Sequence, residues 1–577
     1  MKYAISLVFM ATAAAQFIPN KPVTIHAAVE SVPVRAGAIE GPGAGLGATP
    51  PAPPPAGRGG FTGRTGARGG TGGRSGATTA PIPAAPPAPE IGSAGAAVEQ
   101  TSQGTRPAIE LVASFDGLGE GFSGRSFPGS EKSEARPGRG GIDISLAVGP
   151  DHIFEILNGN MAVFTKKGKK YDSTGRLLYG PVPNNTVFTG MGERCNATNN
   201  SDTVVRYDQL ADRWLFVLPV FARREGPGAP YAMCYAVSAT PDPLGKYYRY
   251  EFERQLFPDY PRPAVWPDGY YNPTSTSDNM LPEIVTQKHA CVADRARMLK
   301  GQPATEQCIV IDGAVFLLNA DVDGRRPPPK GAPNIMMSTG GTQLLKNFED
   351  DGIYFYRMHV DWKDASKTTV SPPEKIAVAP YHYLCDGQLS NCVPQPGTAR
   401  RLDSQGDKLI ERLVYRNFGD HEAILAEHSV ATAAHAGGIR WYEFHLNHGR
   451  DPALFQQGTY APDAPNRPAY RWLGSMAMDR RGNIALGYSF GSDADSPGQR
   501  VAARLAGDPK GQLTFHESVL AEGQASQTGS LRWEDYTNIA VDPSDDCTFW
   551  FTGNYLKTGA TTSTTRIGSF AVPGCKK

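Results

Sequence analysis

The sequence has 577 residues, with 57 Lys and Arg against 57 Asp and Glu, so its formal net charge at pH 7 is zero. A balanced charge produces no global field toward polyanions, which argues against nucleic acid or an anionic membrane surface as the partner. No apolar run reaches the roughly 20 residues that a membrane-spanning helix needs, so we expect no membrane-spanning segment.

The N-terminus has the form of a secretory signal. Residues 1–15 combine one early positive charge at Lys2, a short apolar core and a small-residue ending at Ala13–Ala15. The alternative, a buried first strand, is less favoured. We therefore expect a mature chain that begins near Gln16 and is secreted or retained at the cell surface or in the periplasm.

Residues 16–106 are rich in Pro, Gly, Ala and Arg, as in Pro50–Pro55. Because this segment has so few large apolar side chains, their burial cannot offset the conformational entropy lost when the chain is ordered. The segment is therefore predicted to be a disordered linker. Its Arg-Gly spacing also resembles nucleic-acid-binding tails, but a secretory signal upstream disfavours that function. The remaining residues, 107–577, are predicted to form one domain.

A strand–turn–strand pattern recurs through this domain. An apolar run, a turn with Pro, Asp or Gly and a second apolar run suggest two antiparallel strands, and equivalent positions are Val148, Tyr207, Val265, Met478 and Val541. Their intervals are 59, 58, 213 and 63 residues, and weaker copies near Met336 and Leu425 fit the long interval. The pattern predicts an all-β fold, a single β-propeller of seven four-stranded blades. Six or eight blades, or a pair of β-sandwiches, remain alternatives.

The ends of the domain are expected to meet. Residues 109–115 are predicted to be the first strand and residues 566–572 the last, and pairing them in one blade would close the ring.

The eight cysteines form four pairs of neighbours along the chain, and this arrangement favours four local disulfides in an exported protein. The predicted pairs are Cys195 with Cys234, Cys291 with Cys308, Cys385 with Cys392, and Cys547 with Cys575. Zinc ligation by cysteine is disfavoured, because the sequence has no C-x-x-C pair.

Acidic residues stand just before the repeated strands. In a propeller the innermost strands line the channel, so the residues that precede them converge at one mouth although they are far apart in sequence. The predicted ring of acids is Asp143, Asp202, Asp259, Asp420 and Asp535. Such carboxylates suit acid and base catalysis on a polar substrate or an oxygen-rich calcium site. The sequence establishes no cofactor, and calcium is the one that such a set of carboxylates would suit.

Neighbouring residues add further candidates for the mouth. Asp143, Asp202, Asp420 and Asp535 are the candidate acids and bases, with His421 as a proton carrier; Asp259, Tyr271, Arg471, Trp472, Arg532 and Trp533 are the candidate ligand-binding residues. Aromatic rings would stack on sugars, and arginine would bind carboxylates in a bidentate manner. The structural alternative is that each Asp caps a turn and each Trp packs in the core.

The chain resembles exported bacterial β-propeller proteins of unassigned function and is similar in outline to the sialidase superfamily. The resemblance lies in residues 143–150 (DISLAVGP), 204–215 (VVRYDQLADRWL), 291–298 (CVADRARM), 417–422 (NFGDHE) and 532–550. It implies a propeller and export. The Ser-x-Asp-x-Gly-x-Thr-Trp box typical of sialidases is absent, so the resemblance assigns no catalytic residue.

Three functions remain open at this point. The first is a secreted propeller, expected to be a monomer, that binds a polar ligand, a glycan, at the channel mouth. The second is a glycoside hydrolase or lyase that uses carboxylates at the mouth, which requires a carboxyl pair about 5–9 Å apart. The third is a cell-surface adhesion or scaffold module without a small-molecule site.

Overall fold

The computed structural model describes residues 29–31, 93–125, 132–134, 142–191, 193–221, 231–254, 257–276, 287–312, 314, 316–340, 352–387, 391–446, 451–462 and 468–576. The predicted signal segment at residues 1–15 and most of the predicted linker lie outside these residues. In the described part, no helix is long and apolar enough to cross a membrane.

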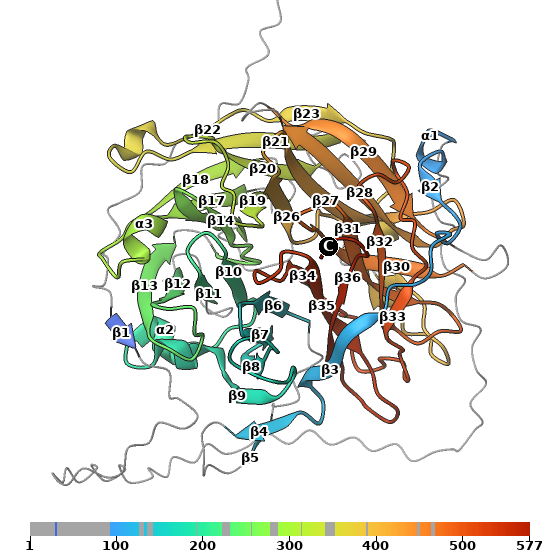
Figure 1. Cartoon of the computed structure of the whole chain (residues 1–577), viewed down its shortest axis with the longest axis horizontal. Helices are drawn as coiled ribbons and strands as arrows, with labels where there is room; N and C mark the ends of the chain where they lie inside the picture. Colours follow the sequence, from blue (N-terminus) through green and yellow to red (C-terminus); the bar gives the residue numbers. More distant parts are fainter. Residues whose placement is uncertain are drawn as a thin grey trace, which may run out of the picture.

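Antiparallel strand groups follow one another around a central channel (Figure 1). In the first half of the ring each group begins with the strand nearest the channel. The groups are β6 (Ile144–Val148), β7 (His152–Leu157), β8 (Asn160–Thr165) and β9 (Leu177–Pro183); β10 (Val204–Asp208), β11 (Arg213–Val220), β12 (Tyr231–Ser238) and β13 (Tyr247–Arg254); β14 (Ala264–Trp266), β15 (Gly269–Tyr271), β17 (Gln287–Ala293) and β18 (Glu306–Asp312), with β16 (Thr274–Thr276) on β17.

The second half of the ring continues in the same way. Its groups are β19 (Leu318–Val322), β20 (Asn334–Thr339), β21 (Gly352–His359), β22 (Thr369–Val370) and β23 (Glu374–Ala377); β26 (Leu413–Asn417), β27 (Glu422–Ala431), β28 (Gly437–Leu446) and β29 (Ala453–Tyr460); β30 (Tyr470–Met478), β31 (Ile484–Gly491), β32 (Gly498–Arg504) and β33 (Ser518–Ala521); β34 (Asn538–Val541), β35 (Thr548–Tyr555) and β36 (Thr564–Ala571) with β3 (Leu111–Gly119).

Minor elements decorate this ring. Short strands add to sheet edges or pair with each other, and the helices have one turn each. They are β1 (Val29–Ser31), β2 (Glu99–Gln100), β4 (Ser123–Arg125), β5 (Lys132–Glu134), β24 (Asn391–Val393), β25 (Leu402–Asp403), α1 (Ser93–Ala96), α2 (Glu193–Ala197), α3 (Arg295–Met298), η1 (Asn184–Phe188), η3 (Ala365–Lys367) and η4 (Leu384–Gly387).

We call the strand that opens each group its first strand. Each first strand contacts the next along the chain, from β6 to β34, and β34 contacts β6. The predicted all-β, propeller-like architecture is therefore confirmed. The count of seven blades stays a prediction, because a parallel pairing of β19 with β26 merges two groups into one sheet.

Five of the positions used to define the repeat lie on first strands: Val148, Tyr207, Val265, Met478 and Val541. The two weaker copies do not, since Met336 lies on β20 and Leu425 on β27, each the second strand of its group. The first strand β19 carries Asp321, which lines the channel, and β26 ends in the polar residues Arg416 and Asn417. Their apolar pattern is therefore weak, and the sequence comparison selected the next strand instead.

The ring closes through its two ends. β3 pairs antiparallel with β36, so a strand near the start of the described chain completes the last group. This confirms the expected meeting of the terminal strands. The preceding residues 93–106 also pack on the ring: β2 pairs with β29, and Arg106 forms a bridge with Phe515. These contacts begin before the predicted domain boundary at residue 107.

All four predicted disulfides are confirmed: Cys195–Cys234, Cys291–Cys308, Cys385–Cys392 and Cys547–Cys575. Cys291 and Cys308 are directly opposite each other on β17 and β18. Cys547–Cys575 ties the turn before β35 to the residues after β36, next to the closure of the ring.

Ionic groups fill the channel. The Arg412 guanidinium forms ion pairs with Asp321 at 2.7 Å and with Asp323, and Arg206 pairs with Glu411 and lies 3.6 Å from Asp321. All five side chains are buried. A cavity of about 20 Å³ beside them, also lined by Asn538, has room for about one water. The channel is thus a polar core and not an open pore.

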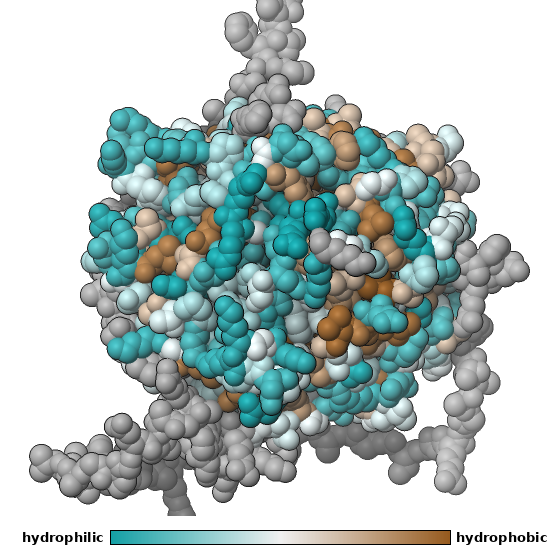
Figure 2. All heavy atoms as spheres, in the orientation of Figure 1, coloured by the Kyte–Doolittle hydropathy of each residue, from teal (hydrophilic) through white to brown (hydrophobic). Residues whose placement is uncertain are grey.

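The outer surface is mostly hydrophilic on the face of the ring shown in Figure 2, where apolar residues form only small groups. Such a surface is expected for a protein face in contact with water.

We predict that Arg412→Leu lowers the free energy of unfolding by about 3–5 kcal/mol, because the buried Asp323 loses the guanidinium that pairs with it and the buried Asp321 retains only Arg206 at 3.6 Å. Urea unfolding measures this loss. The control is Arg325→Leu, which breaks the exposed pair with Asp212 and should cost less than about 1 kcal/mol. Equal losses in the two variants would contradict the role assigned to the channel ion pairs.

Candidate functional site

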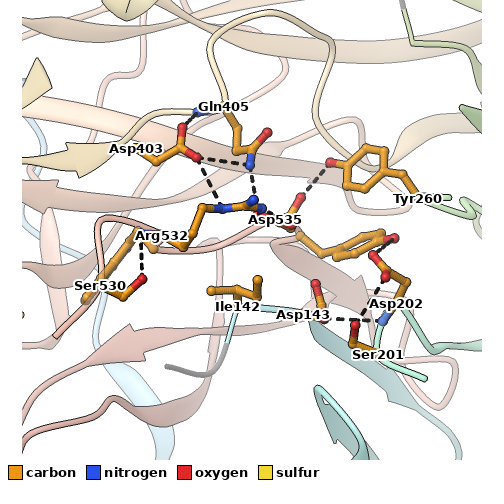
Figure 3. Close-up of polar contacts among 12 residues, drawn as sticks. Ile142, Asp143, Ser201, Asp202, Tyr260, Asp403, Gln405, Ser530, Arg532 and Asp535 are labelled. Atoms are coloured by element: carbon orange, nitrogen blue, oxygen red, sulfur yellow. Dashed lines mark hydrogen bonds and ion pairs between the residues drawn. The ribbon is translucent and has the colours of Figure 1, made fainter. Parts of the chain in front are cut away.

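Three acidic residues that precede first strands meet at one end of the channel. Asp143 is the residue directly before β6, whereas Asp202 and Asp535 lie shortly before β10 and β34. One carboxylate oxygen from each lies within 4.8 Å of the others (Figure 3). The sequence analysis selected all three, and the structure brings them together. We call this end of the channel the mouth.

Asp143 is the most enclosed of the three, with a relative exposure of 1%. The side-chain oxygen of Asn158 accepts its backbone N–H at 2.9 Å, which fixes the loop before β6. Its Oδ2 accepts the backbone N–H of Asp202 at 3.3 Å, while its Oδ1 has no hydrogen-bond partner among the described residues. Burial, followed by the nearby Asp535 carboxylate, raises the pKa of Asp143 to about 7.

Arg532 is the cation of the mouth. Its guanidinium pairs with both carboxylate oxygens of Asp535 and lies 3.3 Å from Asp403. Gln405 donates to the same Asp535 carboxylate at 2.8 Å, and the Tyr260 hydroxyl donates to the Asp535 backbone carbonyl at 2.5 Å. Arg532 therefore connects the loop after β25 with the loop that enters β34.

Asp403 is a second buried acid beside this cation. Burial raises its pKa to about 6, although a hydrogen bond from the Gln405 backbone and the charge of Arg532 act in the opposite direction. The mouth therefore holds two carboxyl groups, Asp143 and Asp403, whose affinity for protons is increased.

The loops at the mouth hold residues in the left-handed backbone region. Asp202 has φ 62°, Tyr260 φ 55° and Gln405 φ 48°. Such conformations cost energy in non-glycine residues and persist where the surroundings fix them, often at functional sites. Here each of the three side chains takes part in the hydrogen bonds of the mouth.

An aromatic and cationic wall continues the mouth. The Tyr260 ring lies 4.6 Å from Tyr536 between centroids, and the Arg262 guanidinium stands 4.4 Å over Tyr260. Lys408 Nζ lies 4.4 Å from the centroid of Phe316, a half-buried ring. These cations over ring faces are favourable contacts in a partly dry site.

Several predicted site residues lie elsewhere. Asp420 and His421 are in the turn between β26 and β27, at the opposite end of β26 from the mouth, and the Asp420 side chain is 84% exposed. His421 contacts Asp420, Phe418 and His445 there. Their predicted position is wrong because β26, not β27, is the first strand of its group.

Four other candidates are buried between sheets instead of facing a ligand. Trp472 packs against Trp533, with ring centroids 6.3 Å apart, and the Trp533 indole donates to Ser489. Arg471 pairs with the buried Glu517 at 2.7 Å, and the Tyr271 hydroxyl donates to Asp268. The structural alternative therefore holds for Tyr271, Arg471, Trp472 and Trp533.

Asp259 has an intermediate position. It is half-buried in the loop before β14, its backbone carbonyl accepts the Ser275 N–H at 2.9 Å, and its charge acts on Arg262 and Tyr536 at the mouth. Of the predicted ligand-binding residues, Arg532 has the most direct connection with the mouth, and its side chain is 32% exposed.

The sequence analysis missed Tyr260, Asp403 and Gln405. Asp403 ends β25, and Gln405 lies in the loop between β25 and β26. Because the repeat was placed at Leu425 on β27, Asp420 was predicted at the mouth in their place. The turn signal Ser404-Gln405-Gly406 before the apolar run at Leu409 and Ile410 could have revealed this loop.

No family model matches this chain, and no curated protein matches it. Similar solved structures include the catalytic domain of a GH62 alpha-L-arabinofuranosidase from Coprinopsis cinerea, with 10% identity, a TM-score of 0.28 and coverage of 80% of this chain and 98% of that one. An exo-beta-1,3-galactanase from Clostridium thermocellum has 9% identity, a TM-score of 0.26 and coverage of 80% and 97%. A neuraminidase-like protein of A/little yellow-shouldered bat/Guatemala has 8% identity, a TM-score of 0.29 and coverage of 61% and 91%. TM-scores this low carry no conclusion about fold or function.

We predict that the stability difference between the parent and Asp143→Asn depends on pH. The folded parent keeps the Asp143 proton up to about pH 7, while the unfolded chain releases it near 3.8, so the stability contributed by this residue falls as the pH rises between these values. Relative to the variant, which cannot titrate, the parent should lose on the order of 4 kcal/mol across this range. Urea unfolding at pH 4 and pH 7.5 tests this, and a pH-independent difference would contradict it.

Proposed function

We propose that this protein is an exported, seven-bladed propeller that binds a polar, hydroxyl-rich ligand, a glycan, at the mouth. The observation that carries the proposal is the convergence of loops from separate strand groups on Arg532 and Asp535. Both groups reach solvent, with side-chain exposures of 32% and 13%. The closed contact ring of first strands supports seven blades, and four disulfides fit an oxidising compartment outside the cytoplasm.

The chemistry of the accessible groups supports a sugar. Arg532 offers N–H donors, Asp535 and the half-buried Asp407 offer acceptors, and Phe316 offers part of an aromatic face. Sugar hydroxyls both donate and accept, so they can bind to such a mixed set, and a ring face can stack on an aromatic side chain.

The charge at the mouth favours a neutral glycan over an acidic one. In the part of the chain that the structure describes, the mouth has the three cations Arg262, Lys408 and Arg532 against six carboxyl groups, those of Asp143, Asp202, Asp259, Asp403, Asp407 and Asp535. An anionic sugar would meet this excess of carboxyl groups, whereas a neutral sugar avoids the repulsion.

Burial favours binding over hydrolysis. A glycosidase needs one carboxyl group in contact with the glycosidic oxygen and a second one near the sugar ring. Asp143 and Asp202 have relative exposures of 1% and 5%, so a sugar at the mouth reaches Asp535 before it reaches either of them. These two acids are therefore assigned to shaping the charge of the mouth.

We predict that a neutral oligosaccharide from a mixed panel raises the melting temperature of the full chain, since a ligand that binds the folded state stabilises it by mass action. Arg532→Lys keeps the charge but loses the planar group that binds in a bidentate manner, and it should weaken binding at least about tenfold by calorimetry. The matched control is Asp420→Asn, which changes an exposed carboxylate in the β26–β27 turn and should bind like the parent.

Two results would overturn the proposal. One is the absence of a melting shift with every sugar in the panel, which would favour an adhesion or scaffold module. The other is equal affinity of the parent and Arg532→Lys, which would place the ligand elsewhere.

A further inference from the structure

The acidic oxygens at the mouth lie close enough together to bind one hard cation. Oxygen ligands bind Ca²⁺ at about 2.4 Å, so two oxygens on the same ion are at most about 4.8 Å apart. One oxygen from each of Asp143, Asp202 and Asp535 lies within this distance of the other two. Ca²⁺ accepts irregular sets of oxygens, whereas Mg²⁺ demands near-ideal octahedral geometry and keeps several of its waters, so these buried carboxyl groups suit Ca²⁺ better.

A second observation concerns a single buried oxygen. Asp143 Oδ1 lies beneath the surface and has no hydrogen-bond partner among the described residues, and in Figure 3 it points toward Asp535. A buried acceptor without a partner destabilises the folded state, which is a reason to expect a ligand for it. Its other oxygen is already engaged by the Asp202 N–H, so the open side of this carboxyl faces the other acids.

The charges around Asp143 also favour a cation. The charged and titratable groups that face it are the carboxylates of Asp202 and Asp535, the Arg532 guanidinium and the Tyr536 phenol, and the Ser201 hydroxyl lies beside them. Arg532 divides its contacts between Asp535 and Asp403, so the guanidinium does not balance the carboxyl groups of the mouth. Without a further cation, this repulsion is relieved when Asp143 takes up a proton.

We propose that Asp143, Asp202 and Asp535 bind one Ca²⁺ at the mouth. Each ligand comes from the loop before a different first strand, so the ion connects the groups that begin with β6, β10 and β34. Protons compete with the ion, because Asp143 must be ionised to bind it. The inference concerns the same mouth as the proposed glycan site but does not depend on glycan binding.

A second cluster of potential metal ligands does not support a metal site. His289, Cys291 and Cys308 lie close together, but both sulfurs are joined in a disulfide and offer no thiolate.

The test uses the full chain, stripped with EGTA and titrated with Ca²⁺ or Mg²⁺ by calorimetry and thermal unfolding at pH 8 and pH 5.5. We expect Ca²⁺ to bind and raise the melting temperature at pH 8, with at least tenfold weaker binding at pH 5.5 and at least tenfold weaker binding of Mg²⁺. Asp143→Asn and Asp202→Asn should each lose at least tenfold in Ca²⁺ affinity, while Asp420→Asn should bind as the parent does.

Circular dichroism establishes that each variant is folded, and Asp202→Asn serves if Asp143→Asn is not. The inference is overturned if Ca²⁺ gives neither heat nor a melting shift at pH 8, if Mg²⁺ acts equally well, or if the parent and both variants bind alike. Sugar titrations in EGTA separate the two proposals. Sugar binding without a calcium response overturns the cation site alone, and calcium binding without any sugar response overturns the glycan proposal alone.

Discussion

The ion pairs along the channel hold the first strands of several groups in register with one another. Arg206 comes from β10, Asp321 from β19 and Arg412 from the residue before β26, and Arg412 also donates to the carbonyl of Ile539 on β34. A buried charge is tolerated only with a partner in good geometry, so each pair fixes the register of one first strand against another. Apolar packing between sheets permits small shifts that these contacts do not.

The mouth depends on that register. Its acids lie only a few residues before first strands, so their positions follow from where the strands are held. The loop that carries Tyr260 is linked to β10 by a bond from Arg206 to the carbonyl of Pro263. The exposed groups Arg532 and Asp535 thus rest on buried partners, which is how a rigid scaffold keeps a binding site in a fixed geometry.

The sequence predicts the parts of this architecture that depend on local pattern. Strong turns after β6, β10 and β34 placed Asp143, Asp202 and Asp535 correctly, and cysteine proximity identified the disulfides. The prediction failed at β26, because Arg416 and Asn417 break the apolar run that the hairpin pattern requires. Arg416 pairs with Asp546 and Asn417 donates to the carbonyl of Pro327, so residues that connect β26 to neighbouring loops are the ones that conceal it from sequence analysis.

Other features required long-range information. β30 is buried along nearly its whole length, so no alternation of apolar and polar residues shows which of Arg471 and Trp472 faces a neighbouring sheet. The role of Gln405 depends on a left-handed backbone and on Asp535, which is 130 residues away. Neither relationship leaves a periodic signal in the sequence.

The pairing of β3 with β36 has a consequence for the order of events during synthesis. Leu111 finds its partner Phe570 only when the chain has been made as far as β36. Until then, β3 has no partner in β36 and one edge of the incomplete ring has no neighbour. Contacts between residues so distant in sequence form slowly, and exposed edges favour aggregation. Ring assembly therefore waits for β36, and the nascent chain is most vulnerable in the interval before this strand emerges.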